Sequence, residues 1–237
     1  MMDATPSPAA PPERRWGPLD SIQRRVLGVL IEKAKTTPAG YPMSVNAVVA
    51  GCNQKNNREP ITAYDDFDVE KALSEMQTLG VVKEIDWVGR VPKYKHLAYE
   101  WLGVKPVELA VLGELLLRGT QSVGDLRGRA SRMEPIADLS ALKPIVDGLV
   151  ERGLMIELTP PGRGQLVTHG LYPAQELGEL RAREGGRPRE PVAATSSAAS
   201  PPSSDLRAEV AGLRAELQRL TERIERIESS AREPSDE

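Results

Sequence analysis

Apolar residues recur with helical spacing in two segments of the chain that match each other. Residues 22–31 place apolar side chains at i, i+4, i+5, i+8 and i+9, and residues 107–116 repeat this pattern at an offset of 85. Such a broad stripe is typical of a helix that faces a protein core. Each segment also carries a central glycine, Gly28 or Gly113. Because glycine costs about 1 kcal/mol relative to alanine inside a helix, its repeated use predicts that another helix approaches closely there.

A second pair of matching segments lies at an offset of 73. Residues 69–79 and 142–152 place apolar residues at i, i+4 and i+7, and Gly80 and Gly153 follow as expected for helix caps that lead into strands. The two offsets differ by twelve, so the first copy has twelve extra residues, which we place around residues 52–60. Pro144 lies just past the first turn of its segment, which predicts a late start for that helix.

Shorter elements complete each copy. Ser44 and Ser122 are candidate N-caps of a short helix between the two longer ones. After the third helix, alternating residues predict a hairpin of 81–88 with 91–97, and another of 154–158 with 165–169. Three helices followed by a β-hairpin form a winged helix. We therefore expect an α+β protein with two tandem winged-helix domains (helix-turn-helix plus β-hairpin), at 19–104 and 105–180.

The flanking segments have a different composition. Residues 1–18 and 181–204 are rich in Pro, Ala, Ser and charge, which predicts a disordered tail and a disordered linker. Residues 205–230 show a heptad pattern that favours a parallel coiled-coil homodimer. The alternative is an amphipathic helix that folds back on its own domains. The apolar seam consists of Leu206, Val210, Leu213, Leu217, Leu220, Ile224 and Ile227.

Charge changes what the expected fold implies about function. The chain has a net charge of −3, and neither expected domain is basic. The third helix of the first domain carries Asp65, Asp66, Asp68, Glu70 and Glu75. In a helix-turn-helix protein this helix normally enters the major groove, where carboxylates would face phosphates and no counterions would be released. The sequence therefore argues against standard reading of DNA by this helix.

Positive charge gathers elsewhere in the first domain. The candidate contacts to nucleic acid or to a protein partner are Lys55, Arg58, Arg90, Lys93 and Lys95. The last three belong to the first hairpin, where Trp87 and Tyr94 are interleaved with them. Two roles remain open: DNA association through hairpin and insertion, or a protein-interaction adaptor that docks through its winged helices. The simplest alternative is that these are solvated charges that protect strand edges from pairing.

Nothing in the sequence predicts an enzyme. Cys52, the single cysteine, has no histidine near it in sequence to lower its pKa, so we expect a small buried core residue. We find no phosphate-binding loop, nucleotide fingerprint or paired carboxylates, and we expect no catalytic residues, cofactor or metal. No apolar run approaches the roughly 20 residues of a membrane span, and no signal peptide is recognisable. We therefore expect a cytoplasmic protein that does not enter a membrane.

Several short motifs resemble one known family. The segments at 30–33 (LIEK), 36–38 (TTP), 41–46 (YPMSVN), 52–55 (CNQK), 57–60 (NREP) and 115–119 (LLLRG) resemble the bacterial YceH-like family. The resemblance covers about residues 19–180 and implies a tandem winged-helix fold, with the coiled-coil tail seen in such proteins. It carries over no catalytic residue and implies no activity. The motifs coincide with the polar insertion, where we expect any functional surface.

Overall fold

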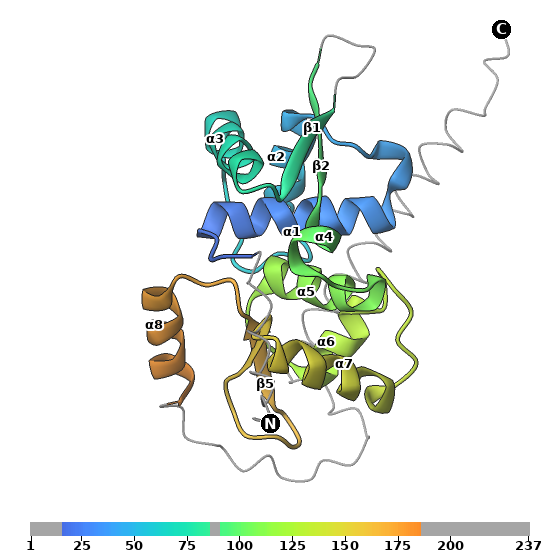
Figure 1. Ribbon diagram of the computed structural model, residues 1–237, viewed down its shortest axis with the longest axis vertical. Helices are drawn as coiled ribbons and strands as arrows, with labels where there is room; N and C mark the ends of the chain where they lie inside the picture. Colours follow the sequence, from blue (N-terminus) through green and yellow to red (C-terminus); the bar gives the residue numbers. More distant parts are fainter. Residues whose placement is uncertain (1–15, 86–90, 186–237) are drawn as a thin grey trace, which may run out of the picture. The chain divides into compact units, whose positions relative to one another are not determined.

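The computed structural model describes residues 16–85 and 91–185 of the chain (Figure 1). They form a mixed α+β fold, which confirms the expected fold class. The heptad seam at 206–227, the predicted linker beyond residue 185, the tail before residue 16 and the candidate contact Arg90 lie outside the described residues.

Residues 16–85 and 91–104 contain four α-helices, a 3₁₀ turn and one hairpin. In chain order these are α1 (Ser21–Thr36), η1 (Pro38–Gly40), α2 (Val45–Cys52), α3 (Asp66–Thr78), β1 (Val82–Ile85), β2 (Lys93–His96) and α4 (Ala98–Leu102). The sequence that follows repeats most of this order. Its elements are α5 (Pro106–Arg118), β3 (Gln121–Ser122), α6 (Val123–Ala130), α7 (Leu139–Glu151), β4 (Met155–Glu157), β5 (Leu166–His169) and α8 (Ala174–Gly185).

Side-chain caps fix where the matching helices begin. Ser44 accepts a hydrogen bond from the backbone of Ala47 at the start of α2, and Ser122 does the same for α6. Asp65 and Asp138 cap α3 and α7, which are both 13 residues long. The offset is 85 between α1 and α5, 78 between α2 and α6, and 73 between α3 and α7. Seven of the twelve extra residues therefore lie before α2 and only five after it, so our placement of all twelve around residues 52–60 was wrong.

Each hairpin is extended by the segment that precedes the second helix. In the second copy the order is β3-β5-β4, and Gln121 of β3 pairs with Val167 of β5. In the first copy Met43 and Tyr94 form an isolated antiparallel bridge at the corresponding place. The strand registers also correspond, since Val82 pairs with His96 and Met155 with His169. The sequence did not predict this third segment because it is too short to show alternation.

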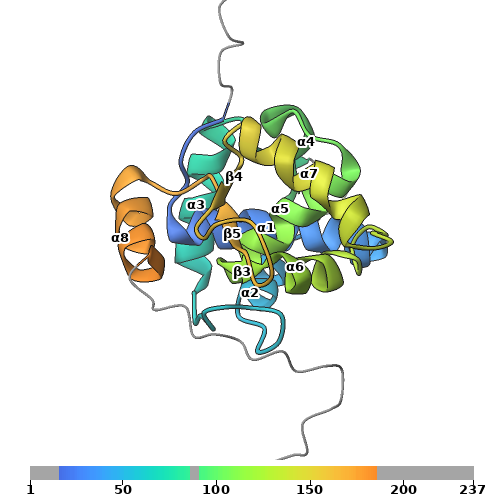
Figure 2. The same cartoon turned by 90° about the horizontal axis from the view of Figure 1, so that it is seen from below.

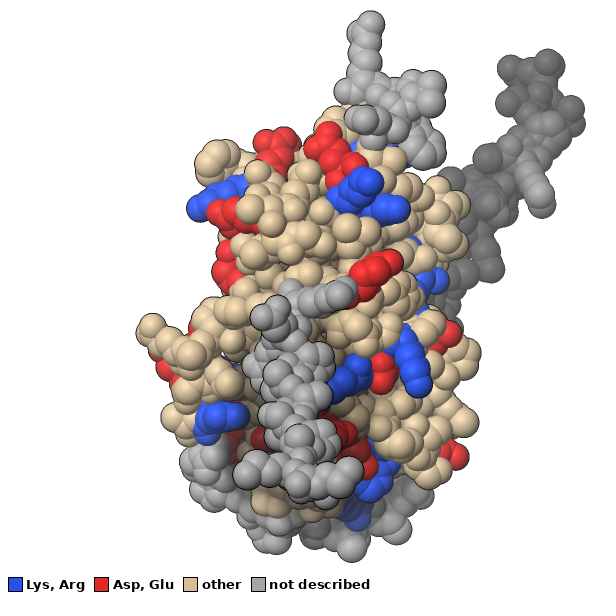
Figure 3. Space-filling view, in the orientation of Figure 1, with Lys and Arg blue, Asp and Glu red and all other residues tan. Residues whose placement is uncertain are grey.

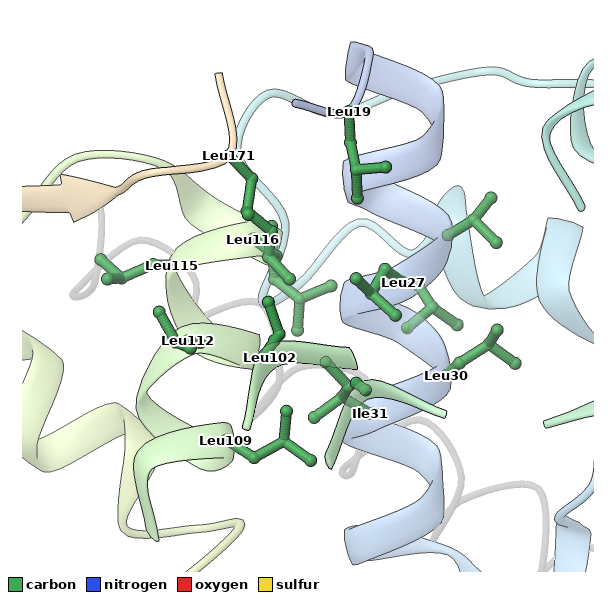
Figure 4. Packing of buried hydrophobic residues seen from close by; sticks show 14 of the residues in the cluster. Leu19, Leu27, Leu30, Ile31, Leu102, Leu109, Leu112, Leu115, Leu116 and Leu171 are labelled. Carbon is green, nitrogen blue, oxygen red and sulfur yellow. The ribbon is translucent and has the colours of Figure 1, made fainter. Parts of the chain in front are cut away.

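The core is centred on the contact between α1 and α5. Figure 4 shows apolar side chains of the two helices meeting between their ribbons, among them Leu27 and Ile31 from α1 and Leu109 and Leu116 from α5, while Leu30 lies on the other side of α1. The two mid-helix glycines lie in this contact. A Cβ at Gly28 would lie 3.0 Å from Leu117 Cδ2, and one at Gly113 would lie 2.7 Å from Ile31 Cγ2. The predicted close approach of another helix is confirmed at both positions.

Three boundaries differ from the expected ones. Pro144 lies inside α7 and does not delay its start, because Asp138 accepts a 2.8 Å hydrogen bond from the backbone of Ala141 and fixes the helix there. Helix α8 continues to residue 185, past the expected boundary at 180, since Leu180 is buried. The β3-β5-β4 sheet separates α8 from α6 and α7 (Figure 2). Trp16, expected in the tail, packs against the core.

Candidate macromolecular interface

Helix α3 presents an acidic surface that contains an exposed aromatic ring. The helix starts at a capping box in which Asp65 and Asp68 each accept a hydrogen bond from the other's backbone N–H. Its buried side is apolar and packs on the core. We call the opposite side the acidic face of α3, which consists of Asp66, Phe67, Glu70, Lys71 and Ser74, all exposed. Phe67 is the single phenylalanine of the chain and is 72% exposed.

One of the carboxylates expected on this face has a structural partner. Glu75 accepts a 2.8 Å hydrogen bond from Nε2 of Gln23 on α1. It thereby helps to hold α3 against α1, so it is less suited to a partner than Asp66 or Glu70. The remaining acidic groups and the Phe67 ring lie on consecutive turns and so form one continuous stripe along the helix.

The first hairpin gathers lysines on one side. Lys83 and Lys95 are directly opposite each other in the β1-β2 register, and Lys93 lies two residues from Lys95. Residues two apart in a strand point to the same side. We call Lys83, Lys93 and Lys95 the hairpin lysines. Because like charges directly opposite each other destabilise a strand pair, this side favours a bound anion or carboxylate.

The other two candidate contacts, Lys55 and Arg58, belong to the polar insertion between α2 and α3 and differ in their exposure. Lys55 is exposed, but Arg58 is not available to a ligand, because its side chain is fully buried. Its Nη2 lies 2.5 Å from Oε2 of Glu32 on α1, and its Nε donates to the carbonyl of Gly51 at 2.9 Å. Our expectation that Arg58 contacts a partner was therefore wrong: a buried carboxylate on α1 holds it inside.

Arg58 belongs to a buried ionic network that spans the two copies. Nη1 of Arg132 lies 2.5 Å from Oε1 of Glu32, and its Nη2 lies 3.0 Å from Oε2 of Glu114 on α5. Burial alone would raise the pKa of Glu32, but the hydrogen bonds and charges of Arg58 and Arg132 hold it below its usual value. Arg118 completes the network beside Glu114. A charged residue within each apolar helix stripe was the sequence signal for this network.

The insertion also braces the second copy directly. Arg118 Nη2 donates to Oδ1 of Asn57 at 2.8 Å, and the backbone N–H of Glu59 donates to the carbonyl of Leu117 at 3.0 Å. Within the first copy, the side-chain amide of Asn53 donates to the carbonyl of Tyr64 and accepts from its N–H. The contacts with Arg118 and Leu117 give the insertion motifs a structural role in joining the copies.

The cysteine and the two histidines have pKa values shifted by burial. Cys52 is buried, as expected, and burial raises the pKa of its thiol to about 12 against the lowering effect of nearby arginines. Burial lowers the pKa of His96 to about 4 and that of His169 to about 3. His96 on the first hairpin is therefore neutral at pH 7 and adds no positive charge to the hairpin lysines.

Three further observations concern surface charge, membrane-spanning helices and metal ligands. On the face drawn in Figure 3, Lys and Arg are scattered among Asp and Glu and form no continuous basic area. Within residues 16–85 and 91–185, no helix combines the length and apolar character needed to cross a membrane. The same residues contain no group of three or more His, Cys, Asp or Glu placed to hold a metal ion.

Comparison with known proteins relates most of this region to one family. A family model described as "Protein of unknown function, DUF480" matches residues 19–163. A UPF0502 protein of Rhodopirellula baltica is 54% identical over 159 residues, which cover 67% of each chain. A UPF0502 protein of Geobacter sulfurreducens is 45% identical over 143 residues, or 60% of this chain and 63% of that one. A third, from Citrifermentans bemidjiense, is 42% identical over 173 residues, or 71% of this chain and 80% of its own.

Proposed function

The chain belongs to the DUF480 family, whose relatives carry the name UPF0502 protein, and on this premise we propose that it is a non-enzymatic, tandem winged-helix adaptor. The observation that carries the proposal is the acidic face of α3, where Phe67 is exposed between carboxylates. In a winged helix this element is the usual recognition helix. A partner that fits it has a basic segment with an apolar pocket or side chain.

The winged-helix part of the proposal is supported by the repeated order of elements. Each copy runs helix, helix, helix and hairpin, with a short segment paired to the outer side of the hairpin's second strand. The copies also agree in detail, since Nδ1 of His96 accepts from the N–H of Ala98 and Nδ1 of His169 accepts from that of Leu171. This interpretation is in keeping with the YceH-like resemblance.

Cross-linking of the full chain in its own cells tests the adaptor. We compare the natural sequence with the double variant Phe67→Ser, Glu70→Lys and with the control Leu139→Ser, which removes an exposed apolar side chain from α7. We expect one cross-linked protein of defined stoichiometry with the natural sequence and the control, and its loss in the double variant. The same product from all three proteins would rule out docking through α3.

A second function, contact with nucleic acid, is favoured by the hairpin lysines. Lys83 and Lys95 face each other in the register, where phosphate groups would relieve their repulsion. We expect duplex DNA to bind at low salt with an affinity that falls steeply as salt rises, and to bind more weakly when Lys83 and Lys95 are changed to Glu. No change in fluorescence anisotropy of labelled duplex at micromolar protein would exclude this function.

We also propose that the chain works in the cytoplasm as a homodimer joined through residues 205–230. The heptad seam supports the dimer. Sedimentation equilibrium of the full chain, compared with a chain ending at residue 187, tests it. A monomer in both cases would exclude the coiled coil and favour a helix that folds back.

A further inference from the structure

A cavity of about 370 Å³ lies where the two copies meet. Its walls come from the start of α1, the insertion around Glu59 and Tyr64, the end of α5, strand β5 and helix α8. We propose that this cavity binds a small phosphate ester, with the phosphate held by arginines. The inference is independent of the proposed adaptor function, because the acidic face of α3 and the hairpin lysines do not line the cavity.

The lining is rich in guanidinium groups. Four arginines and one carboxylate contribute to the wall: Arg24, Arg25, Arg118, Arg183 and Glu59. Three of the arginines have a carboxylate partner outside the lining. These pairs are Arg24 with Glu176 at 2.5 Å, Arg118 with Glu114 at 3.1 Å, and Arg183 with Glu184 at 3.2 Å.

Arg25 is the exception among the four. It is 4% exposed, and among the described residues no carboxylate forms an ion pair with it. Its Nη1 and Nη2 donate to the carbonyls of Cys52 at 3.1 Å and Pro60 at 2.7 Å. Its Nε is buried and has no hydrogen-bond partner within residues 16–85 and 91–185. A buried charge without an ion-pair partner is costly, and burial lowers the pKa of this guanidinium, although the nearby Glu59 acts against the shift. An anion in the cavity would supply the counter-charge.

A hydroxyl group in the same wall is also left unsatisfied. Oγ1 of Thr120 is buried and has no hydrogen-bond partner in the described part of the chain. Ser21, the first residue of α1, lines the cavity as well. Ser21 and Arg25 lie one turn apart on α1, and Thr120 follows α5, so the fold brings donors from two distant parts of the sequence together.

The donor set points to a phosphate ester. Guanidinium groups match the geometry of phosphate oxygens and form paired hydrogen bonds with them. Phosphate oxygens can also accept from several donors at once, which suits a wall in which Arg25 has no carboxylate partner. Glu59 would repel bare phosphate, but it can accept a hydrogen bond from a hydroxyl or amino group in the organic part of an ester. The cavity volume lies within the range of sites for small organic ligands.

Titration calorimetry of the full chain tests the site with two probes, adenosine 5′-monophosphate and inorganic phosphate. We expect one site per chain for the nucleotide and weaker binding of inorganic phosphate. Equal binding of both, with the same response to the variants below, would support the phosphate site with free phosphate as its ligand. The absence of saturable binding of either probe at millimolar concentration would overturn the proposal.

Variants separate the site from general charge effects. Thr120→Val removes the unsatisfied hydroxyl and should keep or raise stability, while nucleotide binding becomes about tenfold weaker. Arg183→Gln removes a cavity arginine that is mostly exposed, and it should also weaken binding. Arg163→Gln removes the same charge from the exposed loop before β5, outside the lining, and serves as the control. Unchanged affinity in both cavity variants, or equal loss in all three, would overturn the proposal.

Discussion

Replacing Gly113 with alanine tests whether the contact between α1 and α5 sets the stability of the protein. A Cβ at this position would lie 2.7 Å from Ile31 Cγ2, well inside van der Waals distance. Ile31 is fully buried, and a β-branched side chain in a helix has one strongly preferred rotamer. The methyl group of Ile31 therefore cannot swing aside, and the two helices must move apart.

Two opposing effects determine the size of the change. Alanine favours a helix over glycine by about 1 kcal/mol. Overpacking of a close-packed core costs about 1–3 kcal/mol, and the short distance to Ile31 indicates the upper part of that range. We expect the free energy of unfolding to fall by about 1–2 kcal/mol in Gly113→Ala, with a decrease in Tm of about 2–8 °C for a chain of this size.

Gly148 provides a matched control. It also lies inside a helix, α7, but a Cβ there would meet nothing within 4 Å. We expect Gly148→Ala to gain up to about 1 kcal/mol from helix propensity. Urea unfolding followed by circular dichroism measures both variants. If Gly113→Ala were as stable as Gly148→Ala, the close approach of α1 and α5 would not limit stability. In a double-mutant cycle, Ile31→Ala should reduce the cost of Gly113→Ala, because it removes the clashing methyl group.

Three further predictions follow from the buried polar groups and from α3. Because His96 and His169 have lowered pKa values in the folded state, the unfolded chain binds more protons at acidic pH. The free energy of unfolding should therefore fall as pH drops below about 6.5, by up to about 1.4 kcal/mol per pH unit for each histidine. His169→Asn, which keeps an acceptor for the backbone, should flatten this slope in urea unfolding at several pH values, and an unchanged slope would contradict the reasoning. Arg58→Met should lower the free energy of unfolding by about 3–5 kcal/mol because Glu32 loses its buried partner; a loss below about 1 kcal/mol in the same assay would show that Arg132 alone suffices. Phe67→Ser should change stability by less than about 0.5 kcal/mol, because the ring is exposed; a large drop in Tm would mean that the ring packs against the protein.

The apolar pattern predicted the long helices and the glycine contact, because a core-facing stripe is visible within one segment. It did not locate the extra residues of the first copy, since the difference between two offsets gives their number but not their place. His96 and His169 are followed at three residues by Tyr99 and Tyr172, at the same offset of 73. That signal was in the sequence, and it would have aligned the ends of the two hairpins.

The candidate site was harder to predict, because the fate of a charged residue depends on partners that are distant in the sequence. Arg58 and Lys55 lie three residues apart in one polar segment, yet one is buried and the other exposed. The difference comes from Glu32, which lies 26 residues before Arg58. Nothing in the sequence distinguishes Arg25 from the neighbouring Arg24. Only the fold shows that Arg25 is buried beside a cavity without an ion-pair partner among the described residues.

The reciprocal glycines also bear on how the two copies hold together. Leucines of α5 pack against Gly28, and an isoleucine of α1 packs against Gly113. The helices that meet are themselves the corresponding members of the two copies, so the internal contact has the form of an interface between identical subunits. A single unit with such a surface would pair with a second copy at a strength that depends on protein concentration. With both units in one chain the pairing is intramolecular, so it does not depend on concentration.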